Sequence, residues 1–298
     1  MGIRRSQLVN MNQHYRRFSL DYFLDCQQRL GIRQIELWCG ASHFWLDHEG
    51  TGDVPALKQK LREHDVRVVS VTAPSIAYQY QYASQESELL EYSFRYFSNA
   101  IRLAAQLGAD RVVVHCGGLS KLTREEALQN TLTGLREILR RMEQEGCGDV
   151  TLCVETMGKQ NVMGTLEEVA AICQMDERLL PCIDFGHLNA REQGSLRCAE
   201  DHVKLLEYLI SQLGKDRMRH FHVHFSHIEY GKGGEVRHLT FEDTEYGPWF
   251  DDCVQALLAL DLHPRVICES AGTQAEDALL MQQIYQARAR GEEPAIRA

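Results

Sequence analysis

The sequence lacks the cysteine pairs that mark disulfide scaffolds and thiolate metal sites. Its ten cysteines are scattered and form no C-x-x-C pair. Several lie within apolar, strand-like stretches, among them Cys116, Cys153, Cys182 and Cys268. Cysteines in such positions are typical of small buried side chains in a reducing compartment. The pattern therefore argues against disulfides and against a metal site built from thiolates.

Segments that would direct the chain to a membrane are also lacking. No uninterrupted apolar run reaches the roughly 18 residues of a membrane-spanning helix, and the N-terminus has no apolar core of a signal peptide. We therefore expect a cytoplasmic protein without a membrane partner. Basic residues are in deficit as well. The formal net charge of −10 argues against an extended nucleic-acid surface, although a local basic cleft is compatible with it.

A glycine-rich phosphate turn is missing after the first expected strand, which disfavours an open, doubly wound sheet. Instead, strand-like runs and helical patterns alternate along the whole chain, in eight successive units. Such alternation predicts a parallel sheet with helical crossovers, and eight units predict closure into a barrel. We therefore predict an α/β protein that forms a single (β/α)8 TIM barrel domain over residues 1–298.

Apolar periodicity and capping signals set the expected boundaries of these units. Thr165 followed by Glu168, for example, is a capping-box signal for the start of a helix. The long, tyrosine-rich loop after the third strand and the loop after the seventh are expected to form a substrate wall or lid. The expected strands cover residues 8–11, 34–38, 67–72, 111–115, 150–155, 181–184, 219–224 and 265–269. The expected helices cover residues 18–30, 54–64, 87–107, 123–145, 165–174, 200–213, 248–260 and 275–287.

Ionisable side chains stand at the ends of the last four strand-like runs, namely Glu155, Asp184, His222 and Glu269. The carboxyl ends of all strands in a parallel barrel open onto one face, so these side chains are expected to meet. Clustered carboxylates repel one another unless a cation neutralises them, and this donor set suits Mn2+, Mg2+, Co2+ or Zn2+. The pattern predicts a divalent metal site. The alternative is a set of buried carboxylates paired with Arg or Lys.

Three further histidines fall near the same strand ends. His187 lies three residues after Asp184 and is a candidate for binding a substrate oxygen or a second metal. His115 ends the fourth strand, where it is either a ligand or a neutral histidine of the core. His238 follows a glycine-rich loop at residues 231–234 and either folds back over the site or is exposed.

The seventh run contains alternating histidines. Because side chains alternate along a strand, His220, His222 and His224 share one side. We choose His222 as the ligand, since it stands at the expected strand end, and keep His224 as the alternative. Near the end of the second strand, Glu36 and Trp38 are candidates for the substrate wall, with a purely structural role as the alternative for both.

Together these motifs resemble the xylose isomerase-like barrel superfamily, which includes sugar isomerases and epimerases and the endonuclease IV (AP endonuclease family 2) proteins. The resemblance runs essentially from end to end. Three N-terminal motifs are similar to sugar epimerases: residues 35–38 (IELW), 43–45 (HFW) and 68–72 (VVSVT). Four C-terminal motifs are similar to endonuclease IV-like proteins: residues 155–158 (ETMG), 183–191 (IDFGHLNAR), 222–226 (HVHFS) and 236–238 (VRH).

For an isomerase or epimerase, the resemblance implies one metal ion per chain and a small sugar or sugar phosphate as substrate. The residues that match the metal ligands are Glu155, Asp184, His222 and Glu269. Glu155 and Glu269 are then expected to act as the acid–base pair that transfers a proton through an enediolate, while His187 holds a substrate oxygen.

For endonuclease IV, the resemblance implies three zinc ions and a phosphodiesterase that acts on abasic DNA. The three further histidines match additional ligands of that pattern. The sequence departs from it in two places. The loop after the third strand reads TAPS at residues 72–75, where a histidine is expected, and Val236 stands where an aspartate is expected, with Glu235 one residue earlier. Because the central site is complete and the outer sites are not, the sequence favours the isomerase or epimerase and keeps the zinc phosphodiesterase as the alternative.

Two points stay open at this level. A barrel without catalysis is disfavoured because both glutamates are present. The oligomeric state, including a homo-oligomer, is not determined by the sequence.

Overall fold

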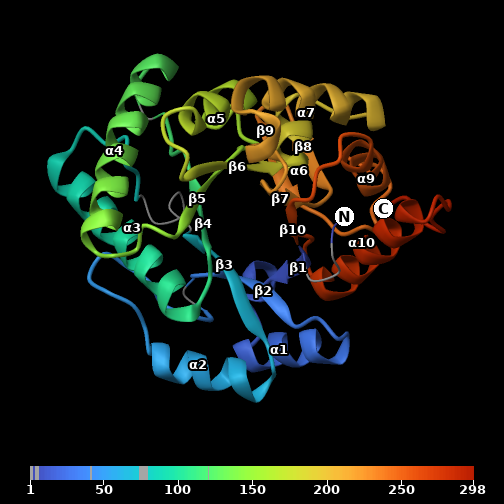
Figure 1. The fold of residues 1–298 in the computed structure, drawn as a ribbon, viewed down its shortest axis with the longest axis horizontal. Coiled ribbons are helices and arrows are strands. Elements are labelled where there is room, and N and C mark those ends of the chain that lie inside the picture. The colour runs from blue at the N-terminus through green and yellow to red at the C-terminus, as the bar shows by residue number, and fades with distance from the viewer. Residues whose placement is uncertain (1–2, 4–6, 41, 74–79, 120) are drawn as a thin grey trace.

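In the computed structural model, parallel strands close into a barrel (Figure 1). The structure describes residues 3, 7–40, 42–73, 80–119 and 121–298. Around the barrel the order is β1 to β7 and then β10, which pairs with β1. Within the described residues these eight strands are Leu8–Met11 (β1), Gln34–Trp38 (β2), Arg67–Ala73 (β3), Arg111–His115 (β4), Thr151–Glu155 (β5), Leu179–Asp184 (β6), His222–Phe225 (β7) and Arg265–Cys268 (β10). The predicted (β/α)8 barrel is confirmed.

Helices form a ring around the barrel, as Figure 1 shows. They are Leu20–Arg29 (α1), Val54–Glu63 (α2), Ser87–Leu107 (α3), Arg124–Gln144 (α4), Leu166–Cys173 (α5), Phe185–Arg191 (α6), Ala199–Leu213 (α7), Lys215–Met218 (α8), Phe250–Ala259 (α9) and Gln274–Ala289 (α10), with a short 3-10 helix at Gln13–Tyr15. Helices α6 and α8 were not expected from the sequence. Among the described residues, no helix is both long and apolar enough to cross a membrane.

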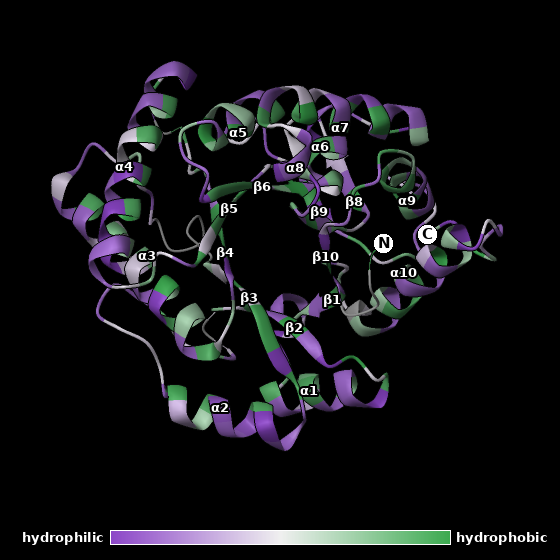
Figure 2. Cartoon of the chain, viewed as in Figure 1, coloured by the Kyte–Doolittle hydropathy of each residue, from purple (hydrophilic) through white to green (hydrophobic). Residues whose placement is uncertain are grey.

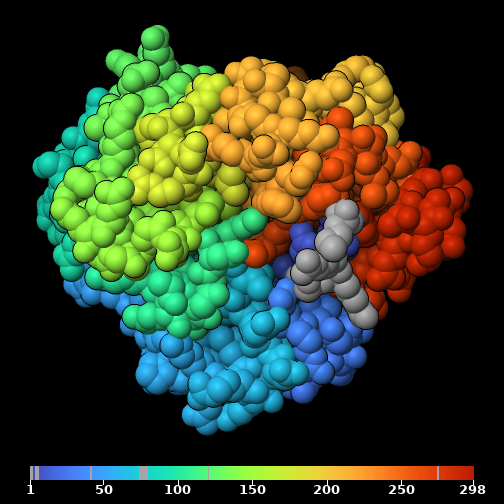
Figure 3. All heavy atoms as spheres, viewed as in Figure 1, coloured from blue at the N-terminus to red at the C-terminus, as the bar shows by residue number. Residues whose placement is uncertain are grey.

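The strand sequences explain why the sheet is buried on both faces. Val112 to Val114 and Leu152 to Val154 have almost no solvent exposure. Figure 2 shows apolar stretches in strands such as β3 and β6, inside a ring of helices of mixed polarity. Inside the barrel Val113, Cys153 and Cys182 form a small apolar cluster. Figure 3 shows that segments from the first, middle and last parts of the chain meet near the centre of the face in view.

The start of α5 shows how capping fixes a loop beside the barrel mouth. Thr165 accepts the backbone N–H of Glu168 at 3.2 Å, and the Glu168 carboxylate accepts the N–H of Thr165 at 2.9 Å, which confirms the predicted capping box. Glu168 also pairs with Arg124 at 2.7 Å and accepts the N–H of Gly164 at 2.7 Å. These bonds fix the loop between β5 and α5 to helix α4 and to the start of helix α5.

An antiparallel hairpin, β8 (Ile228–Gly231) and β9 (Gly234–His238), interrupts the connection from β7 to α9. The sequence predicted a loop here. Gly234 has φ of 87°, and a Cβ at this position would lie 2.0 Å from the carbonyl oxygen of Gly158. Glycine is therefore required by both backbone conformation and space. The contact brings β9 beside the loop that follows β5.

Candidate active site

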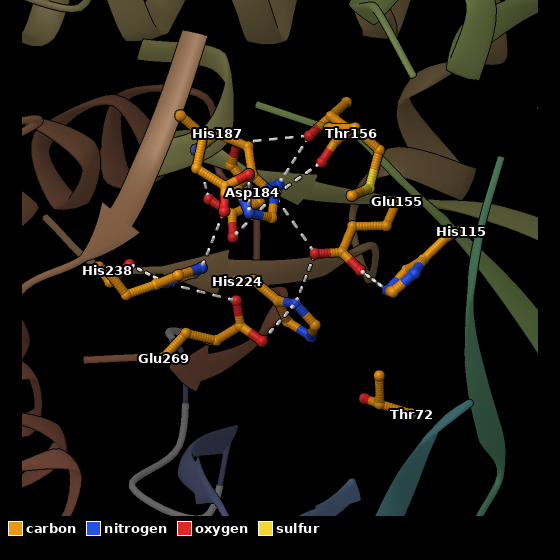
Figure 4. Close-up of polar contacts among 12 residues, drawn as sticks. Thr72, His115, Glu155, Thr156, Asp184, His187, His224, His238 and Glu269 are labelled. Carbon is orange, nitrogen blue, oxygen red and sulfur yellow. Dashed lines mark hydrogen bonds and ion pairs between the residues drawn. The ribbon is translucent and has the colours of Figure 1, made fainter. Parts of the chain in front are cut away.

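Four ionisable side chains from adjacent strands converge at one end of the barrel (Figure 4). Glu155 ends β5, Asp184 ends β6, His224 lies in β7 and Glu269 directly follows β10. One ligand atom of each lies within 4.8 Å of the others, and all four residues are buried. Nδ1 of His224 is 3.1 Å from Oε1 of Glu155 and 3.3 Å from Oε1 of Glu269. These four residues are called the central cluster.

The prediction that His222 stands at the end of the seventh strand is wrong. β7 begins at His222, because helix α8 and a turn occupy the residues just before it. In the register with β6, His222 pairs with Cys182 and His224 pairs with Asp184. His224 is therefore level with Asp184, while His222 lies one layer deeper in the barrel. The geometry groups the alternative histidine, His224, with the three carboxylates.

The donor set of the central cluster fits a divalent cation. Oδ2 of Asp184 is buried and has no hydrogen-bond partner among the described residues. Burial, followed by the carboxylates of Glu155 and Asp184, raises the pKa of Glu269 well above its ordinary value. Burial and the neighbouring carboxylates therefore oppose the ionisation of Glu269, and a cation relieves this cost. Three carboxylates and one imidazole suit a hard or borderline ion such as Mn2+, Mg2+, Co2+ or Zn2+.

His115 and His187 border the central cluster. Nε2 of His115 lies 3.2 Å from Oε2 of Glu155. The backbone N–H of His187 donates to Oδ1 of Asp184 at 2.7 Å, and its ring Nδ1 lies 3.3 Å from Oδ2 of Asp184 and 3.5 Å from Oε1 of Glu155. Although burial opposes the charged form, Asp184 and Glu235 raise the pKa of His187 to about 9. Both histidines therefore lie beside carboxylates of the central cluster.

A second group of ligand-type side chains lies beside His187. Oε2 of Glu235 is 3.6 Å from Nε2 of His187, and the rings of His187 and His238 stand 5.3 Å apart, edge to face. Nε2 of His238 is 4.0 Å from Oε1 of Glu235, and its Nδ1 forms a 2.9 Å hydrogen bond with Oγ of Ser226. His238 therefore folds back over the site. Glu235 supplies the carboxylate of this group, whereas Val236 is 56% exposed.

The two residues considered for the substrate wall, Glu36 and Trp38, occupy different positions relative to the cavity. Trp38 lines the cavity above the central cluster. Glu36 is fully buried below it, with its carboxylate 2.8 Å from Nε2 of His224 and 2.9 Å from Nε2 of His222. Glu36 therefore does not line the cavity, which agrees with the structural role that the sequence left open as the alternative. The register between β2 and β3 shifts after Ile35, and the side chain of Glu36 lies inside the barrel among the histidines of β7.

A cavity of about 290 Å³ lies over the central cluster. In the described structure Glu155 and Glu269 line this cavity, whereas Asp184 and His224 do not. The loop after β3 includes residues 74–79, which lie outside the described residues. Sequence reasoning missed five lining residues, Gln13, Arg16, Met157, Lys159 and Val162. All five follow the end of β1 or β5, so their position shortly after a strand was the available signal.

Cys182, His222 and His224 form a deeper group, with ligand atoms within 4.8 Å of one another. Burial raises the pKa of the Cys182 thiol well above its ordinary value, so the thiol stays protonated at neutral pH and is a poor metal ligand. Burial also lowers the pKa of His222 to about 4, so this imidazole is neutral. Glu36 contacts both histidines. We therefore interpret the group as support for the central cluster.

Comparison with known proteins gives one family and two informative relatives. A family model described as a xylose isomerase-like TIM barrel matches residues 25–286. An uncharacterised protein of Methanocaldococcus jannaschii is 33% identical over 198 residues, which cover 66% of this chain and 71% of that protein. A probable endonuclease 4 of a Sulfurihydrogenibium species is 26% identical over 189 residues, which cover 61% of this chain and 66% of that protein.

Solved structures share the fold. A D-tagatose 3-epimerase-like protein matches with a TM-score of 0.70 and 21% identity, over 95% of this chain and 96% of that one. The IolI protein with a bound zinc atom matches with a TM-score of 0.67 and 15% identity, over 94% and 96% of the two chains. At these identities the likeness concerns the barrel itself.

Proposed function

We propose that this chain, which belongs to the xylose isomerase-like TIM barrel family, is a metal-dependent isomerase or epimerase of a sugar or sugar phosphate. The proposal rests on which residues of the central cluster reach the cavity. Glu155 and Glu269 line the cavity, whereas Asp184 and His224 do not. Two carboxylates within reach of a substrate, supported by ligand groups behind them, suit a reaction in which one proton is removed and another returned.

The central cluster supplies the ligands for the metal in this proposal: Glu155, Asp184, His224 and Glu269. When bound by these residues, a divalent cation would supply Lewis-acid chemistry, which favours the loss of a proton beside a substrate carbonyl. We take one ion per chain, because the described residues offer one complete set of three carboxylates and an imidazole. The IolI protein, which has the same fold, binds a zinc atom, and this supports a metal in the present barrel.

Glu155 and Glu269 carry the proton transfer. They enter the cavity from β5 and from the end of β10, so they approach a bound sugar from different strands. One glutamate removes the proton from the carbon beside the carbonyl. The other returns a proton to the opposite face of that carbon, which gives an epimer, or to the next carbon, which gives an isomer. His115, 3.2 Å from Oε2 of Glu155, restrains the orientation of that carboxylate.

His187 and Trp38 complete the substrate site. His187 lines the cavity, is 5% exposed, and can donate a hydrogen bond to a substrate oxygen on which charge develops. Trp38 offers an apolar surface for the C–H face of a sugar and excludes water from the carboxylates. A cavity of about 290 Å³ is of a size for a small molecule of this kind.

Exchange of substrate hydrogen with solvent tests the proposal. Metal-loaded protein is incubated in D2O with ketoses, aldoses and their phosphates, and deuterium in the sugar is measured by mass spectrometry. Glu155→Gln and Glu269→Gln should each lower the exchange rate about 10²- to 10⁴-fold, because each variant lacks one member of the acid–base pair. Glu200→Gln, an exposed position on α7, is the matched control and should exchange at the wild-type rate. Near-wild-type exchange in either cavity variant would exclude the two-glutamate mechanism.

A zinc phosphodiesterase acting on abasic DNA is the second candidate, and one observation favours it. Glu235 lies beside His187 and His238 and supplies a carboxylate to that outer group. The likeness to a probable endonuclease 4 agrees with this reading. Against it, residues 72–75 (TAPS) after the third strand contain no histidine, whereas the endonuclease pattern has one in this loop.

Elemental analysis distinguishes the two candidates. Protein purified without chelator should contain about one divalent ion per chain if it is an isomerase, since among the described residues only the central cluster combines three carboxylates with an imidazole. Two or three zinc ions per chain, together with cleavage of an abasic-site oligonucleotide, would favour the phosphodiesterase instead.

A further inference from the structure

Glu36 is a buried acid outside the proton-transfer pair. Its side chain on β2 has no solvent exposure and does not line the cavity. Burying a carboxylate is costly unless its partners compensate for the lost water. The partners of Glu36 therefore indicate why an acid stands at this position.

Three side chains from β3 and β7 lie within 3 Å of this carboxylate, and two of them form hydrogen bonds with it. Oγ1 of Thr72 donates to Oε1 of Glu36 at 2.5 Å, and Nε2 of His224 lies 2.8 Å from the same oxygen. Nε2 of His222 lies 2.9 Å from Oε2. Because Oε1 is held by both Thr72 and His224, the orientation of the carboxylate relative to the ring of His224 is fixed.

His224 connects Glu36 to the central cluster through its two ring nitrogens. Nε2 faces Glu36, whereas Nδ1 lies 3.1 Å from Glu155 and 3.3 Å from Glu269. A neutral imidazole carries its single proton on one nitrogen only. An anionic acceptor beside Nε2 keeps the proton there and leaves the lone pair of Nδ1 directed into the central cluster.

We propose that Glu36 is a positioning residue, which fixes the tautomer and ring orientation of His224 and thereby sets the affinity of the central cluster for a divalent cation. The inference rests on the metal site of the proposed function. Carboxylates that accept the second N–H of a ligating histidine act in this way in metal sites generally. It also gives Thr72 a role, because its hydroxyl holds Glu36 in place.

Metal titration tests this role without any assay of turnover. Co2+ and Mn2+ are titrated calorimetrically into chelator-treated wild type and Glu36→Gln, and the visible spectrum of bound Co2+ is recorded. Glu36→Gln should weaken metal affinity about 10- to 100-fold and shift the Co2+ spectrum, because a neutral amide is a weaker acceptor for the Nε2 proton. Asp251→Asn is the matched control. Asp251 is also buried, but it pairs with Arg288 on α10, so affinity and spectrum should stay unchanged.

Each outcome decides a separate point. Tight binding by the wild type, with unchanged affinity and Co2+ spectrum in Glu36→Gln, would overturn the positioning role alone. Absence of binding by the wild type would overturn the metal site and the inference with it. Thr72→Val provides the test if Glu36→Gln does not fold. This variant keeps Glu36 but removes one hydrogen bond to it, and should weaken affinity about two- to tenfold. Unchanged affinity in Thr72→Val would then count against the role.

Discussion

At the scale of single residues, Asp184 connects the fold to the site through the two oxygens of one carboxylate. Oδ1 accepts the backbone N–H of His187 at 2.7 Å and so caps the first turn of α6. Oδ2 has no hydrogen-bond partner among the described residues and faces the central cluster. The start of a helix and the position of a candidate metal ligand are thus set by the same side chain.

The two buried histidines of β7 make separable contributions. His224→Ala removes a candidate ligand, so divalent metal affinity should fall by more than the about 10- to 100-fold expected for loss of an outer partner. His222→Ala leaves all four cluster residues in place and should cost less. Calorimetric titration of both variants with Zn2+ measures the difference. A larger loss in His222→Ala than in His224→Ala would restore the assignment made from the sequence.

At the scale of elements, the β8–β9 hairpin carries Glu235 and His238 to the cavity, and its position depends on Gly234. Gly234→Ala would place a Cβ 2.0 Å from the carbonyl oxygen of Gly158 and should displace the hairpin. If Glu235 or His238 contacts the substrate, a displacement of about 1 Å lowers kcat/KM by up to about 10²-fold. Gly233→Ala is the matched control, since a Cβ there meets nothing within 4 Å. Equal kinetics in the two variants would show that the hairpin is not part of the site.

Much of the barrel could be predicted from the sequence, because strands buried on both faces read as short apolar runs. β2 and β4 have the predicted boundaries. The place of His222 could not be predicted in the same way. Alternating histidines are compatible with a strand that begins two residues earlier or later, so they do not fix where β7 starts. Helix α8 shifts this start, but a helix of four residues is too short to be predicted from apolar periodicity.

The partners of Glu36 escaped prediction for a different physical reason. Its bond to His224 joins residues 188 positions apart in the chain. Alternation along a strand predicts the face on which a side chain lies. It does not predict which residues of other strands lie at the same height inside the closed barrel. By contrast, the carboxylates at the ends of β5 and β6 were found correctly, because strand ends are local features.

At the scale of the whole molecule, the central cluster draws on β5, β6, β7 and the end of β10, which are neighbours along one arc of the barrel. Strands β1, β2 and β3 contribute no residue to it. A cation bound by the central cluster would therefore link consecutive strands of one arc. At a concentration one hundred times its Kd, such a ligand adds about 2.7 kcal/mol to the stability of the folded chain.

Hydrogen exchange of the backbone amides should therefore differ between the strands that supply ligands and those that do not. Removal of the ion with a chelator should raise hydrogen–deuterium exchange most in β5, β6, β7 and β10 and least in β1, β2 and β3, as measured by mass spectrometry of peptic fragments. An equal rise in all strands would contradict a cation held by the central cluster. Because the cluster bridges only part of the sheet, a bound cation stabilises the barrel unevenly. When the chain is partly denatured, we expect strands β1, β2 and β3 to unfold first and the strands joined by the cation to unfold last.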